Sequence, residues 1–297
     1  MSLPLLTFIA MMRTFVTGAT QRGRWKARMA MQKGRIRPGK CKVVFFDLEF
    51  YVPEKKRTAS GFCYNPWDKD CRFIGGSFLV ANPERDFNIV KSEVLKMTKS
   101  FWLWEHATEK EMLEHIYALL KTACDQVKNA HDGAVSAILC GIGITSSDVP
   151  ILFELFKRFQ ILSNQEAFAL QNSFRVVDLS QLVIGTFNNP GNLLYPKSKN
   201  HILNKYMYGT KFEPGKSVWQ LYEAKNHAEI QSRVLDEVYS THKCYELIQS
   251  EFESFKKLEE RDKKQKKLLS KAREAAAELS SEVEAVGRVT IKPLTWL

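Results

Sequence analysis

The chain has 297 residues, of which 44% are hydrophobic and 26% charged, and its formal net charge is +11. This composition is typical of a globular, soluble protein and excludes a chain too small or too polar to bury a core. The apolar run at residues 3–12 is far shorter than the ~20 residues of a membrane span. Its basic residues follow the apolar run, unlike those of a secretory signal, so no membrane partner is expected.

The positive charge is concentrated in two segments. Residues 1–46 contain ten Lys or Arg and no acid, and residues 256–273 contain nine Lys or Arg against three acids. The part between them is mildly acidic, an arrangement that favours a polyanionic partner. Basic ends that serve only solubility remain the alternative.

The first 40 residues are predicted to form a basic, flexible arm, because their glycines and Pro38 disfavour a continuous helix. Such an acid-free start suits an organellar transit peptide and a nucleic-acid-binding arm equally well. Six cysteines without a C-x-x-C pair indicate a reduced intracellular compartment. The candidate nucleic-acid-binding residues of the arm are Arg22, Arg24, Lys26, Arg28, Arg35 and Arg37.

Residues 43–50 read Val-Val-Phe-Phe-Asp-Leu-Glu-Phe, a continuous apolar run that ends in two acids. Such a run is typical of a strand in the middle of a sheet, buried on both faces. Because alternate residues of a strand point to the same face, Asp47 and Glu49 are expected to lie side by side. Two adjacent carboxylates at the end of a core strand suggest a divalent cation, although a solvated strand end shows the same pattern.

Further elements follow in order after a polar stretch at residues 51–71. A strand is predicted over residues 72–80, kinked or bulged at its glycines. Thr108 and Glu111 form a capping-box pattern at the start of a helix. Strands are predicted over residues 134–142 and 174–182, and Asp148 precedes the periodic helix 151–159, where it is either a cap or a ligand.

Helical patterns resume at residues 202–208 and 218–223, and a longer one runs from His227 to about residue 257. Apolar residues then recur at 3–4 spacing between residues 268 and 286, which indicates a coiled-coil seam or a surface helix. We therefore expect an arm (1–40), a central folded domain (41–250) and a charged helical extension with an apolar tail (251–297). The extension and tail are a candidate surface for a protein partner.

The order of these motifs resembles that of the DEDD superfamily of 3′-to-5′ exonucleases. Residues 45–50 would be the first motif, residues 141–152 around Asp148 the second, and residues 234–238 with Thr241 the third. The resemblance covers about residues 42–248. It implies an α/β fold of the ribonuclease H-like type, with a mixed β-sheet flanked by helices.

The resemblance also implies a function. Two Mg²⁺ or Mn²⁺ ions would be held by four carboxylates and would hydrolyse phosphodiester bonds of single-stranded DNA or RNA from the 3′ end. In this sequence the implied catalytic and metal-binding residues are Asp47, Glu49, Asp148 and Asp236, with Glu237 as the alternative to Asp236.

One position departs from the family pattern. The family places a His or Tyr before its last Asp to position the attacking water, and here both spacings point to Ser232. Losing such a group typically costs ~10²–10⁴-fold in rate. Either His227, His242 or Tyr239 substitutes for it, or the enzyme is slow, or the chain is a catalytically silent nucleic-acid-binding or scaffold protein on the same fold.

Overall fold

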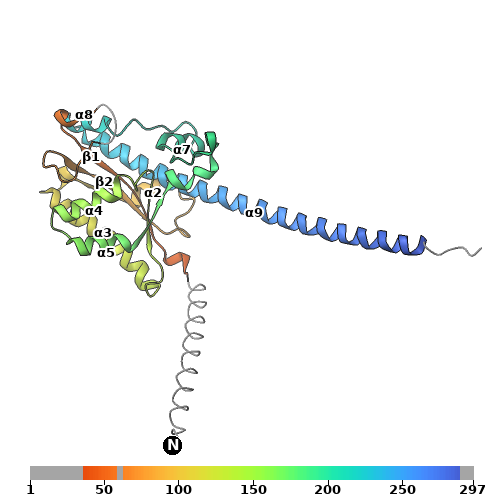
Figure 1. Cartoon of the computed structure of the whole chain (residues 1–297). Helices are drawn as coiled ribbons and strands as arrows, with labels where there is room; N and C mark the ends of the chain where they lie inside the picture. Colours follow the sequence, from red (N-terminus) through yellow and green to blue (C-terminus); the bar gives the residue numbers. More distant parts are fainter. Residues whose placement is uncertain (1–35, 59–62, 288–297) are drawn as a thin grey trace, which may run out of the picture. The chain divides into compact units, whose positions relative to one another are not determined.

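A computed structural model describes residues 36–58 and 63–287 of the chain (Figure 1). Arg37 is an exposed residue before a short 3-10 helix, η1 (Pro38–Lys40), and its amide donates to Nε2 of His131. The other predicted arm residues and the predicted tail lie outside the described part: Arg22, Arg24, Lys26, Arg28, Arg35 and residues 288–297.

A mixed five-stranded sheet forms the centre of the fold, in the order β3-β2-β1-β4-β5. β1 lies in the middle, antiparallel to β2 and parallel to β4, and β5 continues the parallel part. The predicted α/β class, with a mixed sheet flanked by helices, is confirmed. The strands are β1 (Val43–Tyr51), β2 (Arg72–Ala81), β3 (Thr98–Trp102), β4 (Ala137–Gly141) and β5 (Phe174–Asp178).

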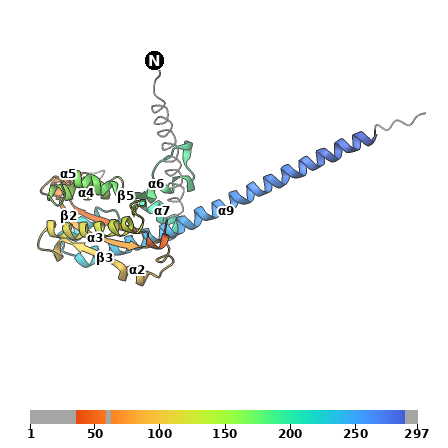
Figure 2. The same ribbon diagram turned by 90° about the horizontal axis from the view of Figure 1, so that it is seen from below.

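The helices cover both faces of the sheet (Figures 1 and 2). The even-numbered residues of β1 from Val44 to Phe50 belong to the main hydrophobic core, together with residues of α3, α4 and α5. The odd-numbered residues face α8 and the first part of α9. The helices are α2 (Lys91–Met97), α3 (Glu109–Ala130), α4 (Asp148–Arg158), α5 (Asn164–Asn172), α6 (Leu179–Leu182), α7 (Lys199–Tyr206), α8 (Ser217–Glu223) and α9 (His227–Gly287).

The local signals of the sequence explain several of these elements. Thr108 caps α3 as expected and accepts from the Glu111 amide at 3.1 Å, but the Glu111 carboxylate reaches the Ala107 amide instead of Thr108. α2, β3 and α5 were not expected, because the segments that form them are short and weakly periodic. α5 nevertheless carries a complete capping box between Ser163 and Glu166.

The predicted kink in the second strand is a β-bulge. Glu49 pairs with Gly75 and Phe50 with Phe73, so Ile74 has no partner on β1. Ile74 is fully buried in a second hydrophobic cluster with residues of α8 and α9. Gly75 has φ +131°, and a Cβ there would lie 2.1 Å from the Phe101 carbonyl oxygen. Only glycine fits this backbone, and the bulge lies directly opposite Glu49.

The long helix α9 runs without a break from His227 to Gly287, where the sequence suggested two helical segments. The described residues divide into two units, one ending at Glu246 and one beginning at Leu247. Residues 253–277 of the second unit are exposed. Among the described residues, no helix has the length and apolar character needed to cross a bilayer.

We predict that Gly75→Ala destabilises the protein by more than about 2 kcal/mol, because the new Cβ overlaps the β3 backbone at a strained φ. Gly185→Ala is the matched control, since no atom lies within 4 Å of its added Cβ, and we expect a change within about 0.5 kcal/mol. Urea denaturation followed by circular dichroism measures both. Equal midpoints for the two variants would contradict this account of the bulge.

Candidate metal centre

The site lies where β1 and β4 separate. The two strands pair in parallel only from Val43 to Phe45, so Leu48, further along β1, has no partner residue on β4. The side chain of Asp148, at the start of α4, fills part of this gap, and its Oδ1 accepts from the Leu48 amide at 3.2 Å. The carboxyl ends of neighbouring parallel strands are where α/β sheets commonly form binding crevices. Here a cavity of about 510 Å³ opens at that point.

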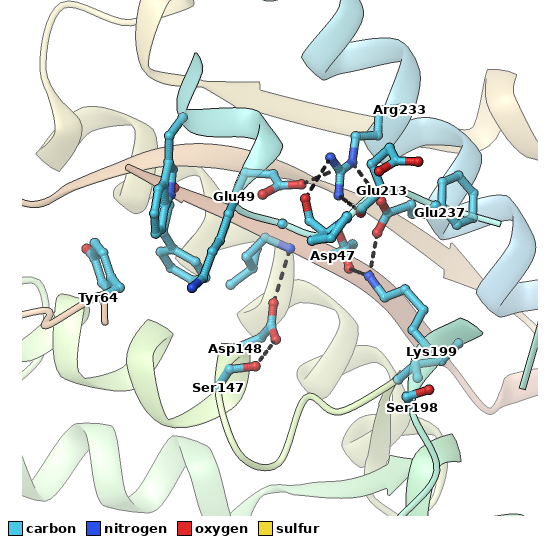
Figure 3. Close-up of a pocket in the computed structure, with 18 of the residues that line it drawn as sticks. Asp47, Glu49, Tyr64, Ser147, Asp148, Ser198, Lys199, Glu213, Arg233 and Glu237 are labelled. Carbon is cyan, nitrogen blue, oxygen red and sulfur yellow. Dashed lines mark hydrogen bonds and ion pairs between the residues drawn. The ribbon is translucent and has the colours of Figure 1, made fainter. Parts of the chain in front are cut away.

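Three carboxylates meet in this cavity (Figure 3). Asp47 and Glu49 lie on the same face of β1, as predicted, and Glu237 reaches them from α9; one oxygen of each lies within 4.8 Å of the others. Glu49 and Glu237 are 6% and 2% exposed. Oxygens on opposite sides of a Mg²⁺ ion are ~4.2 Å apart, so the group has the dimensions and the hard donors that a divalent cation needs. These residues can hold a metal ion.

Two cations lie among the three acids. The Lys199 ammonium, from the first residue of α7, donates to Asp47 Oδ1 at 2.9 Å and to Glu237 Oε2. Arg233, one turn before Glu237 on α9, donates from Nε to Glu237 Oε1 at 2.8 Å and lies 3.8 Å from Glu49 Oε1. The cations partly offset the repulsion between the acids.

The protonation of the acids reflects this balance. Burial, together with the charges of Glu237 and Asp148, raises the pKa of Asp47 to about 7, although Lys199 opposes the shift. Burial and the neighbouring acids also raise the pKa of Glu49. Burial alone would raise the pKa of Glu237, but the charges of Lys199 and Arg233 outweigh it and lower that pKa. Glu237 is therefore the acid whose ionised form is best stabilised.

Asp148 faces the same cavity from the opposite side (Figure 3). It is the first residue of α4 and it is 8% exposed. Its two oxygens accept from the Leu48 amide and the Ser147 hydroxyl, which fix the orientation of the carboxylate. Burial raises its pKa, and those two hydrogen bonds and the Lys199 charge oppose the shift. Asp148 is thus brought to the site, but outside the group of three oxygens.

The prediction that Asp236 belongs to the carboxylate group is wrong, and the alternative, Glu237, takes that place. The Asp236 side chain is 43% exposed and pairs with Lys91 of α2 at 2.7 Å. Successive residues of an α-helix are turned by 100°, so a shift of one position moves a side chain from the buried face toward solvent. Glu237 is on the face of α9 that packs against β1.

The three candidates for a substitute base do not line the cavity. His227 stacks on Trp104 with ring centroids 4.0 Å apart, and Tyr239 lies beneath the Lys91 ammonium. His242 is buried against Phe45, and its Nε2 lies 3.1 Å from the Asp86 carbonyl oxygen. None of the described histidines lines the cavity. Packing against other elements holds all three side chains away from the acids.

Sequence reasoning missed the two cations and an aromatic part of the cavity wall. Arg233 is four residues before Glu237, a spacing that favours an ion pair on a helix, so the choice of Glu237 would have revealed it. No local pattern marks Lys199. The Trp219 indole donates to the Phe50 carbonyl at 3.0 Å and lines the cavity together with Phe212 and Tyr64.

Comparisons with known proteins add no assignment. No protein-family model matches the chain, and no curated protein matches it significantly. The chemistry of the site is therefore the basis for any functional conclusion.

The raised pKa of Asp47 predicts how stability depends on pH in the presence of a chelator. The unfolded chain releases this proton near pH 3.8, whereas the folded protein keeps it to about pH 7. At Asp47 the folded state binds more protons within that window, so the contribution of Asp47 to the free energy of unfolding falls as the pH rises from about 4 to about 7. In urea denaturation across this range, the free energy of unfolding of Asp47→Asn should therefore rise more, or fall less, with pH than that of the wild type. Equal slopes would contradict the shifted pKa.

The corrected ligand set predicts a difference between neighbouring acids. Glu237→Gln should weaken Mn²⁺ binding by at least about tenfold, since a metal site loses much of its affinity with one charged ligand. Asp236→Asn, the adjacent exposed acid, should bind as the wild type does. Titration calorimetry measures both affinities, and weaker binding in Asp236→Asn alone would restore the original assignment.

Proposed function

We propose that the chain is a metal-dependent 3′-to-5′ exonuclease of the DEDD type on a ribonuclease H-like fold. The observation that carries the proposal is the convergence of Asp47, Glu49 and Glu237 within 4.8 Å, with Asp148 facing the same cavity. These acids come from the central strand, the start of α4 and the last helix of the first unit. The order of motifs in the sequence supports the same assignment.

Each residue of the site has a role in this proposal. Asp47, Glu49 and Glu237 would hold a Mg²⁺ or Mn²⁺ ion, and Asp148, oriented by the Leu48 amide, would contribute to a second. When bound, two such ions supply an activated water and stabilise the leaving 3′ oxygen. Water activation by a metal also lessens the need for a histidine at Ser232, which is exposed on α9.

The substrate would be the end of a single strand of DNA or RNA. The cavity has the volume of a typical small-ligand site, which suits a terminal nucleotide better than a duplex. Its Phe212, which is partly exposed, offers aromatic surface on which an unpaired base can stack. The exposed, Lys-rich part of α9 at residues 256–273 supplies positive charge that attracts phosphates.

A catalytically silent nucleic-acid-binding or scaffold protein on the same fold is the second candidate. The observation in its favour is the pairing of Lys199 and Arg233 with the three acids that would hold the metal. In that case the cations replace the ion permanently, and the site is a buried charge network. Digestion by the purified wild type that stops on addition of a chelator would eliminate this candidate.

Substitution of the β1 acids tests the proposed function. Asp47→Asn with Glu49→Gln should reduce Mg²⁺-dependent digestion of single-stranded oligonucleotides by at least about 10²-fold, because the transition-state charge loses its stabilisation. A 3′-labelled substrate should release labelled mononucleotides from the wild type, and a 5′-labelled one should give a descending ladder. Asp236→Asn serves as the control and should digest normally.

Undiminished cleavage by the double variant would exclude the acids of β1 from the reaction. Labelled fragments longer than a mononucleotide from the 3′-labelled substrate would instead indicate an endonuclease.

A further inference from the structure

Lys199 is placed unusually for a lysine. Its ammonium lies inside the carboxylate group, and its side chain is 32% exposed although it contacts two nearly buried acids. The hydrogen bonds described for this ammonium go only to Asp47 and Glu237, two of the three residues that can hold a metal ion. A cation of this chain therefore already stands where a bound cation would draw on the same oxygens.

Arg233 differs from Lys199 in how it is anchored. Besides Glu237, its guanidinium donates to the Ser217 hydroxyl at 2.6 Å and to the Glu213 carbonyl at 2.8 Å. These contacts join α9 to the first residue of α8 and to the segment before it, and they are independent of the metal ligands. Arg233 is thus a fixed part of the wall, whereas the described bonds of the Lys199 ammonium all depend on the acids.

Lys199 is also able to leave. It is the first residue of α7, whose backbone is capped by Ser198 through the His201 amide, so the helix start does not depend on the lysine side chain. Four rotatable bonds separate its ammonium from the backbone. The side chain can therefore withdraw toward the mouth of the cavity without a movement of α7.

We propose that Lys199 is an internal competitor of the divalent ion: its ammonium closes the carboxylate group until a metal displaces it. This inference rests on the proposed metal site. The displaced ammonium would remain at the mouth of the cavity, where a substrate phosphate is its natural partner. Metal loading and phosphate binding would then support each other, because each gives the other a better-prepared site.

Charge favours displacement over permanent replacement. Five carboxyl groups line the cavity, those of Asp47, Glu49, Asp148, Glu213 and Glu237, against three basic groups, those of Lys199, Lys216 and Arg233. With Lys199 withdrawn, a divalent ion brings one more charge to the acids than the ammonium does, and it can engage Glu49 as well. The carboxylates can therefore bind a divalent ion more strongly than they bind the Lys199 ammonium.

Mn²⁺ binding to the metal-free protein tests the competition directly. Lys199→Gln, which removes the charge and shortens the side chain by one atom, should bind Mn²⁺ at least about tenfold more tightly than the wild type, as measured by the electron paramagnetic resonance of free Mn²⁺. Lys197→Gln is the matched control, since Lys197 lies in the same segment and donates to Asn189. This control should bind as the wild type does.

A second measurement uses the wild-type protein and so does not depend on how the variant folds. Acetylation by an amine-reactive ester, read out by mass spectrometry, should increase several-fold at Lys199 when Mn²⁺ is added. Lys197 is the internal reference and should not change. Labelling of Lys199 that stays constant while Mn²⁺ binds would overturn the proposal.

The outcomes separate this inference from the proposed function. Equal Mn²⁺ affinities of wild type and Lys199→Gln, or no binding by either, would overturn the competition. Tighter binding by Lys199→Gln without digestion of nucleic acid by any variant would support the competition and reject the exonuclease. Digestion of nucleic acid by the wild type, together with equal Mn²⁺ affinities of the wild type and Lys199→Gln, would support the exonuclease and reject the competition.

Discussion

The repulsion among buried acids is the constraint on which the site depends. Two carboxylates ~4 Å apart repel by roughly 4 kcal/mol at an effective dielectric near 20, and three acids approach one another here. Burial adds a further cost for each ionised group. The protein meets these costs in two ways: Lys199 and Arg233 bring positive charge, and Asp47 and Glu49 have raised pKa values. Both means are reversible, because an ammonium can withdraw and a proton can be released. A site that binds a divalent ion requires this reversibility, because the ion replaces the ammonium and the protons.

The fold brings these groups together through the middle of the sheet. β1 is covered on both faces, so its even residues pack into the core while Asp47 and Glu49 meet α9. The bulge at Gly75 lies opposite Glu49 and directs Ile74 into the cluster with Val234 of α9. The same part of the sheet therefore sets the direction of the acids and the position of the helix that supplies Glu237. Because β4 ends early, the Leu48 amide is left to orient Asp148.

Period and order in the sequence were sufficient to predict much of this arrangement. The alternation of a buried strand placed Asp47 and Glu49 on one face. Asp148, at the start of α4, was as consistent with a helix cap as with a ligand, and only the resemblance in the order of motifs implied that it belongs to the site. The choice between Asp236 and Glu237 depended on helix phase. The buried face of α9 is marked by Ile230, Val234 and Val238, which are fully buried. Glu237 follows Val234 by three residues, so the spacing of the apolar residues predicts that Glu237, and not Asp236, lies on this face. No such signal marks Lys199, which reaches the site through a contact 152 residues away in the sequence.

The two functional candidates differ in one physical respect, the strength with which Lys199 is held. A permanent charge network gains most when each cation has partners besides the acids it neutralises, as Arg233 does with Ser217 and the Glu213 carbonyl. Lys199 is bound chiefly by the acids themselves and is partly exposed. Buried ion pairs are often close to neutral in net stability, because desolvation offsets their attraction. The exchange of such a lysine for a divalent ion therefore costs the fold little. The same exchange at Arg233 would also break the contacts of α9 with the start of α8 and with the segment before it. This asymmetry favours a site that is closed by its own lysine and opened by a metal.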